Sequence, residues 1–179
     1  DTLVSAAIFS KDFMRDKSYV EGEFVAFGQS LKFPETLGEI ENLLGGKFDI
    51  DDEDEMLAPF DEYKINLHSP FLHDANANDI EFLIKNINES DVNIKDGQIV
   101  KITSTKSLDL SVGNIFLGQD INELKKIDKQ NQNPQRMHIG DEDKAGNVKI
   151  IFDANNDTQY VFNTDGKTIT KIEILNNKY

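Results

Sequence analysis

The chain has 179 residues with a formal net charge of -14 at pH 7, and 38% of its residues are hydrophobic. This length suits one domain or two small units that share a core, and the apolar content excludes disorder of the whole chain. The excess of 33 acidic over 19 basic residues disfavours nucleic acids and anionic membranes as partners, because both are bound mainly through cationic side chains.

The N-terminal part predicts a short helix and then a hairpin. Residues 3–14 carry apolar side chains close to helical spacing. Residues 19–27 and 30–33 are rich in β-forming residues and flank a Gly-Gln turn. Because the chain begins with Asp1 and not with methionine, we also expect that a leader or tag was removed or that the ends were trimmed. Loss of a secretory or lipoprotein leader is one natural cause.

A first amphipathic helix is expected within residues 32–45. Thr36 and Glu39 have the spacing of a capping box, in which side chains satisfy free backbone N–H groups of the first turn. Apolar residues between positions 37 and 44 recur on one helical face. Two glycines follow and end the helix, since glycine readily adopts the left-handed conformation found at helix C-termini.

An acidic segment, residues 35–62, carries -10 of the net charge. Its centre, residues 49–55, contains six carboxylates that repel one another and predict a solvated loop. Three interpretations remain open: a solubilising loop, a docking surface for a basic partner, or a calcium-binding loop. An EF-hand that starts at Asp49 fails, because Asp54 stands where glycine is required and Phe60 stands where glutamate is required.

A short apolar stretch, residues 56–60, directly follows the carboxylates. If it is exposed, it would combine an apolar anchor with charges that steer a basic protein partner. The alternative is that this stretch packs the acidic loop back onto the core. The candidate partner-binding residues are therefore Asp49, Asp51, Asp52, Glu53, Asp54, Glu55, Met56 and Phe60.

The rest of the first half predicts antiparallel strands. Residues 63–67 predict one strand. Residues 80–87 fit either a helix or a strand by periodicity, and the internal repeat described below favours a strand. An Asp-Gly pair at positions 96 and 97 lies between β-rich runs and predicts a hairpin over residues 94–102, because both turn residues tolerate a positive φ.

The second half has a similar order of signals. Ile121, Leu124 and Ile127 form an apolar stripe that predicts a second helix over residues 115–127. The strands expected after this helix are a short edge strand and three longer ones, at residues 136–139, 148–152, 158–162 and 168–175. An Asp-Gly pair at positions 165 and 166 predicts the turn of the last hairpin.

The similar order of helix, turn-rich chain and hairpin in the two halves indicates an internal repeat. We therefore expect an α+β fold with two helix-plus-antiparallel-meander repeats and an N-terminal hairpin. Residues 1–110 would hold the N-terminal segment and the first repeat with its acidic loop. Residues 111–179 would hold the second repeat, with the seam near residues 109–113.

Two motifs resemble those of known bacterial modules. Residues 27–45 join a hairpin to the pattern Phe-Pro-x-Thr-Leu and an amphipathic helix, which resembles small secreted and lipoprotein domains. Residues 115–127 resemble the helix of the helix-plus-meander repeats in the small outer-membrane assembly lipoprotein and the β-lactamase-inhibitor-protein superfamily. The chain departs from that pattern, because its second helix lacks a terminating glycine and its first repeat carries the acidic loop. The resemblance implies a non-catalytic scaffold that binds proteins.

The sequence offers little catalytic chemistry. The chain contains no cysteine, which excludes thiolate nucleophiles and cysteine-ligated metals. His68 and His73 lie five residues apart without a recognised ligand spacing, so we expect exposed loop histidines and neither a metal nor a cofactor. Nucleophile-elbow, zinc-protease and phosphate-loop motifs are absent from the sequence. We therefore expect a protein that is not an enzyme.

These observations predict a non-catalytic protein-binding domain of a bacterial cell-envelope or secreted lipoprotein, and a basic protein is one candidate for its partner. The alternative is an immunity or inhibitor protein that neutralises a basic toxin or enzyme. We expect an extracytoplasmic location, with the cytoplasm as the alternative, since a chain without cysteine suits either side of a membrane. No stretch approaches the roughly 18 apolar residues of a membrane span, so no spanning segment is expected.

Overall fold

The computed structural model describes residues 22–33, 35–43, 55–67, 80–113, 115–124, 137–139, 144–154 and 157–179. Of this part, 53% lies in strands and 12% is helical, arranged as three sheets with one α-helix. The expected α+β fold of two helix-plus-antiparallel-meander repeats is therefore wrong. The described part of the chain is mostly β, and its α-helix comes from the first half of the sequence.

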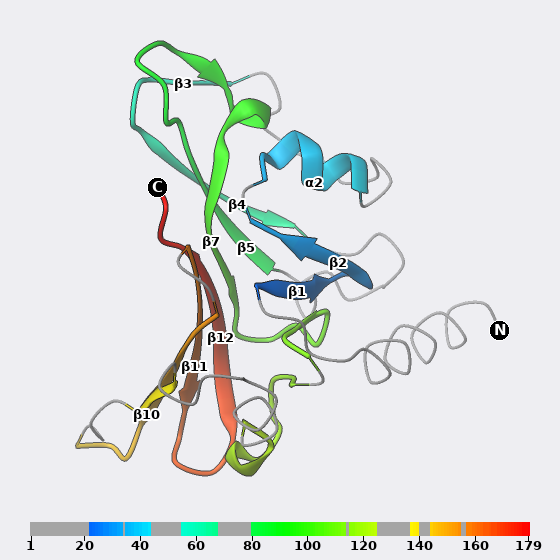
Figure 1. Cartoon of the computed structure of the whole chain (residues 1–179), viewed down its shortest axis with the longest axis vertical. Coiled ribbons are helices and arrows are strands. Elements are labelled where there is room, and N and C mark those ends of the chain that lie inside the picture. The colour runs from blue at the N-terminus through cyan, green and yellow to red at the C-terminus, as the bar shows by residue number, and fades with distance from the viewer. Residues whose placement is uncertain are drawn as a thin grey trace, which may run out of the picture.

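The largest sheet has seven strands, each antiparallel to its neighbours (Figure 1). From one edge to the other they are β4 (Glu62–Leu67), β5 (Ile80–Lys85), β7 (Gln98–Ser104), β12 (Ile169–Asn176), β11 (Thr158–Thr164), β10 (Val148–Asp153) and β9 (Met137–Ile139). The pairing of β7 with β12 joins strands from both sides of residue 110 into one sheet.

A three-stranded sheet and the α-helix lie on one side of this large sheet. In the smaller sheet, β1 (Glu23–Ala26) pairs with β2 (Gln29–Lys32) and with β8 (Leu110–Ser111). Figure 1 shows β1, β2 and the helix α2 (Leu37–Leu43) on the same side of β7 and β12. The expected N-terminal hairpin is confirmed as β1 and β2, although its turn lies one residue earlier than predicted, at Phe27 and Gly28.

The third sheet is a two-stranded ribbon at one end of the molecule. Its strands are β3 (Met56–Leu57) and β6 (Val92–Asn93), which are antiparallel. Figure 1 shows β3 at the end of the molecule opposite to β10. This ribbon holds Met56 and Leu57, the first two residues of the apolar stretch that the sequence marked as a candidate anchor.

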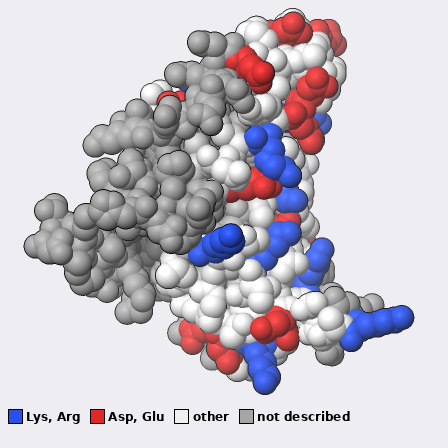
Figure 2. Space-filling model, turned by 180° about the vertical axis from the view of Figure 1, so that it is seen from behind, with Lys and Arg blue, Asp and Glu red and all other residues white. Residues whose placement is uncertain are grey.

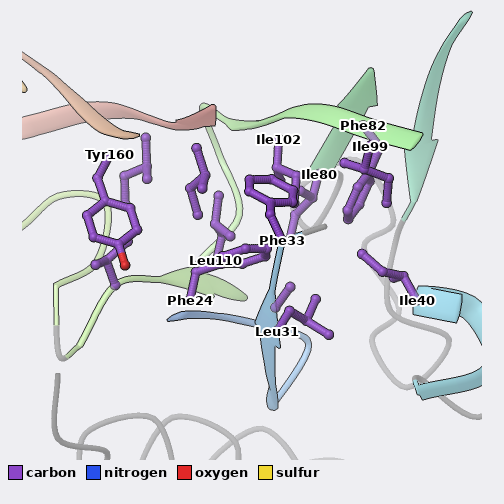
Figure 3. Packing of buried hydrophobic residues seen from close by; sticks show 14 of the residues in the cluster. Phe24, Leu31, Phe33, Ile40, Ile80, Phe82, Ile99, Ile102, Leu110 and Tyr160 are labelled. Atoms are coloured by element: carbon purple, nitrogen blue, oxygen red, sulfur yellow. The ribbon is translucent and has the colours of Figure 1, made fainter. Parts of the chain in front are cut away.

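The core fills the space between the large sheet and the three-stranded sheet. Figure 3 shows Phe24, Leu31 and Phe33 beneath the large sheet, facing residues such as Ile102 and Phe82 that project from it. The ring centroids of Phe24 and Phe33 are 5.2 Å apart. Alternate residues of each strand point into this layer because side chains in a strand alternate between its two faces.

The helix α2 confirms the expected first helix. The Thr36 hydroxyl accepts a hydrogen bond from the backbone N–H of Glu39 at 3.1 Å, as a capping box requires. Leu37 and Ile40 are fully buried on the inward face of the helix. The backbone N–H of Leu37 donates to the carbonyl oxygen of Gly97 at 3.2 Å, which fixes the start of the helix against the chain before β7.

The expected second helix over residues 115–127 is wrong for the residues that the structure describes there. Residues 115–120 are not helical, a 3-10 turn, η3 (Ile121–Glu123), follows them, and Leu124 is the one described residue of this segment in α-helical conformation. The backbone N–H of Gly118 donates to the carbonyl oxygen of Ile169, and the N–H of Ile169 donates to the carbonyl oxygen of Gln119. This pairing with β12 uses groups that a helix would need, and the φ of 84° at Gly118 is incompatible with a right-handed helix.

The expected hairpin over residues 94–102 is also wrong. The segment begins as a 3-10 turn, η2 (Ile94–Asp96), and continues into β7, which pairs with β5 and β12. Gly97 has a φ of -71°, so a left-handed turn is not the reason for glycine here. A Cβ atom at Gly97 would lie 2.2 Å from Cγ2 of Ile84, so close packing against β5 requires glycine at this position.

The remaining strand predictions are confirmed within the described residues. Strands at residues 63–67 and 80–87 correspond to β4 and β5, and the three longer strands of the second half correspond to β10, β11 and β12. The Asp-Gly pair at positions 165 and 166 turns the hairpin between β11 and β12, and Gly166 has a φ of 89°. The edge strand near residue 137 is β9.

The helix expected over residues 3–14 lies outside the described residues. Within the part that is described, no helix has both the length and the apolar character needed to cross a membrane.

Candidate functional site

The candidate partner-binding residues fall into two groups in the structure. Five of them lie outside the described residues, namely Asp49, Asp51, Asp52, Glu53 and Asp54. The other three, Glu55, Met56 and Phe60, lie together around β3 and are exposed to solvent. Met56 is 57% exposed and Phe60 is 58% exposed, values that are high for large apolar side chains.

The stretch 56–60 both packs onto the core and projects from it. Leu57 is buried and belongs to the main core cluster, so it fixes the ribbon to the rest of the protein. Met56 precedes it on the opposite face of β3, because alternate residues of a strand point in opposite directions. In the ribbon, Met56 pairs with Asn93, and the backbone N–H of Ile94 donates to the carbonyl oxygen of Glu55 at 3.1 Å.

A tight turn carries Phe60. The backbone N–H of Asp61 donates to the carbonyl oxygen of Ala58 at 3.1 Å, which closes a four-residue turn. Pro59 is at its second position and Phe60, with a φ of 64°, is at its third. This is the pattern of a type II turn, where glycine is usual at the third position. A phenylalanine in this left-handed region costs about 1–2 kcal/mol relative to its normal conformations.

Asn86 ties this turn to a second loop. Its side chain is fully buried at the end of β5. The Nδ2 group donates to the carbonyl oxygens of Leu57 at 3.0 Å, Ala58 at 3.1 Å and Ser90 at 2.9 Å. Its Oδ1 accepts the backbone N–H of Asn88 at 2.9 Å. One side chain therefore contacts the backbone of both chain segments that carry the ribbon strands, at residues 57–58 and at residues 88–90.

The backbone of Asn86 adds another connection, because its N–H donates to the carbonyl oxygen of Asp61 at 3.0 Å. We call residues 55–61 and 86–93 the tip. The tip contains two exposed large apolar side chains, Met56 and Phe60, on a backbone held by hydrogen bonds from a single buried asparagine.

The tip is acidic. It contains four exposed carboxylates and no lysine or arginine, and the acids are Glu55, Asp61, Glu89 and Asp91. Figure 2 shows red carboxylates at the upper end of the molecule, whereas blue lysines lie along the middle of the same face. The lysines nearest along the chain are already engaged. Lys85 donates to the carbonyl oxygen of Tyr179 at 3.1 Å, Lys95 lies 3.9 Å from Glu41, and Lys64 lies 3.6 Å from Glu81.

The sequence alone does not indicate Asn86, Glu89 and Asp91 as parts of this site. The stretch of asparagine, glutamate, serine and aspartate after β5 is typical of a turn. That composition indicates a loop but does not show which other loop it contacts. The residues that Asn86 joins, Leu57 and Ala58, precede it by 29 and 28 positions, and only the fold brings them together.

Elsewhere in the described part of the chain, Asp109 and Glu173 are carboxylates in unusual settings. Near β8, Asp109 is only 8% exposed, and its Oδ2 finds no hydrogen-bond partner among the described residues. Burial raises the pKa of this carboxyl to about 6.

On the outer face of β12, Glu173 lies 3.3 Å from Lys101 and 3.2 Å from Lys171. Burial raises the pKa of Glu173, but the hydrogen bond and charge of Lys171 and the charge of Lys101 outweigh burial and leave the pKa lowered.

Asp109 and Glu173 do not belong to a metal-binding group among the described residues. In the described part of the chain, no three histidine or acidic side chains are grouped so that they could hold a metal ion. His68 and His73 lie outside the described residues. The tip is therefore the strongest candidate site in the described part of the chain, and it combines exposed apolar side chains with carboxylates.

No family model, curated protein or solved structure matches the chain. The resemblance to bacterial lipoprotein domains and to the β-lactamase-inhibitor-protein superfamily remains a prediction from the sequence motifs.

Proposed function

We propose that this chain is a non-catalytic protein-binding domain and that its tip captures a basic partner protein. The observation that carries the proposal is the position of Phe60. A large aromatic side chain is held in solvent, at the apex of a turn whose conformation it disfavours. Strain of this kind persists only when the surrounding structure enforces it, and it is concentrated at functional sites.

The apolar pair suits an interface anchor. Binding energy at protein interfaces is concentrated in a few large side chains that fill pockets on the partner. Full burial of a phenylalanine or methionine side chain is worth about 1.5–3 kcal/mol each. Because Met56 and Phe60 are more than half exposed before binding, much of that gain remains available to a partner.

The charge of the tip favours a basic partner. Its four carboxylates have no basic residue among them, so they attract a cationic surface and repel an acidic one. Carboxylates at the rim of an interface mainly raise the association rate, and salt weakens that effect. The carboxylates at positions 49–54 directly precede the tip in sequence and would add to the same attraction.

The setting we propose is the bacterial cell envelope or the secreted fraction, as the sequence motifs suggest. The second candidate function is an immunity or inhibitor protein that neutralises a basic toxin or enzyme. The projecting Phe60 turn favours this candidate in one respect, since a protruding anchor complements a concave site such as an enzyme cleft. The two candidates share the same docking surface and differ in what the partner does.

A photo-crosslinking experiment tests the proposal. A benzoylphenylalanine would replace Phe60 in cells that naturally express the chain, with the same probe at the exposed Lys167 as a control. We expect one basic protein to crosslink from position 60 and not from position 167. We also expect the purified chain to bind that protein, with an affinity that falls with salt and is lost in Phe60→Gly.

Phe60→Gly is the informative variant because glycine is the residue that the turn geometry favours. It removes the anchor while preserving the backbone. Absence of a crosslink specific to position 60 would overturn the proposal, and so would unchanged affinity of Phe60→Gly for the crosslinked protein.

A further inference from the structure

We infer that Asn86 is a positioning residue that joins the Phe60 turn and a second loop, residues 88–91, into one docking surface. The partner that fits this surface is a basic protein with an apolar pocket bordered by lysine or arginine side chains. The inference rests on the proposed function, and it goes further by adding the second loop and by naming the residue that orders the first.

The hydrogen bonds of Asn86 show why an amide is required. Its Nδ2 group has two hydrogens and contacts three carbonyl oxygens, those of Leu57, Ala58 and Ser90. Its Oδ1 accepts the N–H of Asn88. Aspartate would lack the donor and would place a negative charge against three carbonyl oxygens. Alanine would leave these polar groups without their partner, a costly state in a buried site.

The same bonds place the two loops side by side. The carbonyl oxygens of Ala58 and Ser90 both lie within 3.1 Å of one nitrogen atom. Ala58 begins the turn that carries Phe60, and Ser90 lies between the exposed Glu89 and Asp91. The loop of residues 88–91 therefore borders the turn that carries Phe60, although the two segments are far apart in sequence.

The hydrogen bonds of Asn86 contribute to binding because they order the tip before the partner arrives. A loop that is already in its bound conformation does not lose further conformational entropy when the partner arrives. Because Asn86 fixes the backbone on both sides of the ribbon, Phe60 and the carboxylates of the second loop keep a constant arrangement. The matching arrangement on the partner is an apolar pocket with cationic neighbours.

The first arm of the test needs no partner. Hydrogen exchange would be measured for the backbone amides of Asp61 and Asn88 in Asn86→Ala. Thr164→Val is the matched control, since the buried Thr164 hydroxyl also donates to a backbone carbonyl, that of Val148, at the β10 end of the sheet. We expect at least tenfold faster exchange of the two tip amides in Asn86→Ala and no change in Thr164→Val.

The second arm uses the protein isolated by crosslinking from position 60. We expect Asn86→Ala to reduce affinity for it about tenfold in the wild-type background and little in the Phe60→Gly background, since the two residues act together. Thr164→Val should bind as wild type does. Additive losses in the double variant, or equal losses in Asn86→Ala and Thr164→Val, would overturn the inference.

A charge reversal tests the second loop without changing Asn86, so it remains informative if Asn86→Ala folds poorly. Glu89→Lys should slow association with the crosslinked protein about fivefold at low salt. Glu39→Lys, an equal change of charge on the exposed face of α2, is the control and should have a smaller effect. Equal effects of the two reversals would remove the second loop from the surface. If Phe60→Gly retains binding, the proposed function itself fails, whereas loss in Phe60→Gly without loss in Asn86→Ala overturns only this inference.

Discussion

The hydroxyl of Tyr160 donates a hydrogen bond of 2.8 Å to the backbone carbonyl oxygen of Glu23, linking β11 of the large sheet to β1 of the small sheet. The two residues are 137 positions apart in the sequence. The tyrosine residue is fully buried and the bond itself is partly buried, so it joins the two layers at the border of the core.

Replacing Tyr160 with phenylalanine should remove this link while keeping the ring. We expect Tyr160→Phe to lower the free energy of unfolding by about 1 kcal/mol, which is typical of a buried hydrogen bond to a neutral acceptor. Urea denaturation followed by circular dichroism measures the change. A midpoint equal to that of the wild type would show that the link does not stabilise the fold.

Replacing Phe60 with glycine should make the protein more stable. The φ of 64° at Phe60 is strained for phenylalanine and unstrained for glycine. The greater freedom of glycine in the unfolded chain offsets part of the gain, so we expect a net increase of about 1 kcal/mol in the free energy of unfolding. Thermal unfolding would detect this increase.

Phe27→Gly provides the contrast, because Phe27 also has a positive φ, of 50°, but packs against the core. We expect this substitution to lower stability through lost packing. A loss of stability in both variants would contradict the idea that Phe60 is kept at the expense of the fold.

Asp109 should make the free energy of unfolding fall as the pH rises. Burial raises its pKa from 3.8 to about 6 in the folded protein. The folded state therefore favours the protonated carboxyl, and the stability that this form contributes is lost as the pH rises through about 6. We expect Asp109→Asn to be more stable than the wild type at pH 7.5, by about 2 kcal/mol, and nearly equal to it at pH 4.

Urea unfolding curves at several pH values would measure the effect of Asp109→Asn. The exposed Asp157→Asn serves as the control. If both variants follow the wild-type pH dependence, then Asp109 does not titrate in this range.

Glu173 should give a pH dependence of stability opposite to that of Asp109. Its pKa is lowered because Lys171, Lys101 and the side-chain amide of Asn163 outweigh the effect of burial. Such a group stabilises the fold above its unfolded pKa near 4.5, and this contribution is lost as the pH falls through the lower folded value. We expect Glu173→Gln to cost about 1 kcal/mol at pH 7, in line with a partly buried charged pair. The difference from the wild type should shrink below pH 4 in chemical denaturation, and a difference independent of pH would refute the assignment.

Strands that alternate strictly were predictable from the sequence. In β11, the buried residues Thr158, Tyr160, Phe162 and Thr164 alternate along one face, while Val161 is buried on the other face. The Asp-Gly pair that follows turns the hairpin as expected. The same dipeptide at positions 96 and 97 led to the wrong prediction of a hairpin turn. Glycine is needed there because a Cβ atom would clash with the side chain of Ile84 from another strand. A local motif predicts correctly only where the fold imposes no other demand on it.

The second helix failed for a related reason. Ile121 and Leu124 have helical spacing, but the preceding backbone pairs with the start of β12, nearly fifty residues later. Long-range pairing outweighed local periodicity. For the tip, the sequence indicated Glu55, Met56 and Phe60 as candidate residues. Neither the conformation of Phe60 nor the contacts of Asn86 could be predicted, since both depend on contacts across the fold.

The position of β12 has a consequence for synthesis of the protein. This strand follows all the other described strands in sequence, yet it lies at the centre of the seven-stranded sheet, between β7 and β11. While the ribosome is still making it, the strands on either side have no partner along their inner edges. Open strand edges can pair with other chains, so the nascent protein is most exposed to aggregation until its final described strand emerges and closes the sheet.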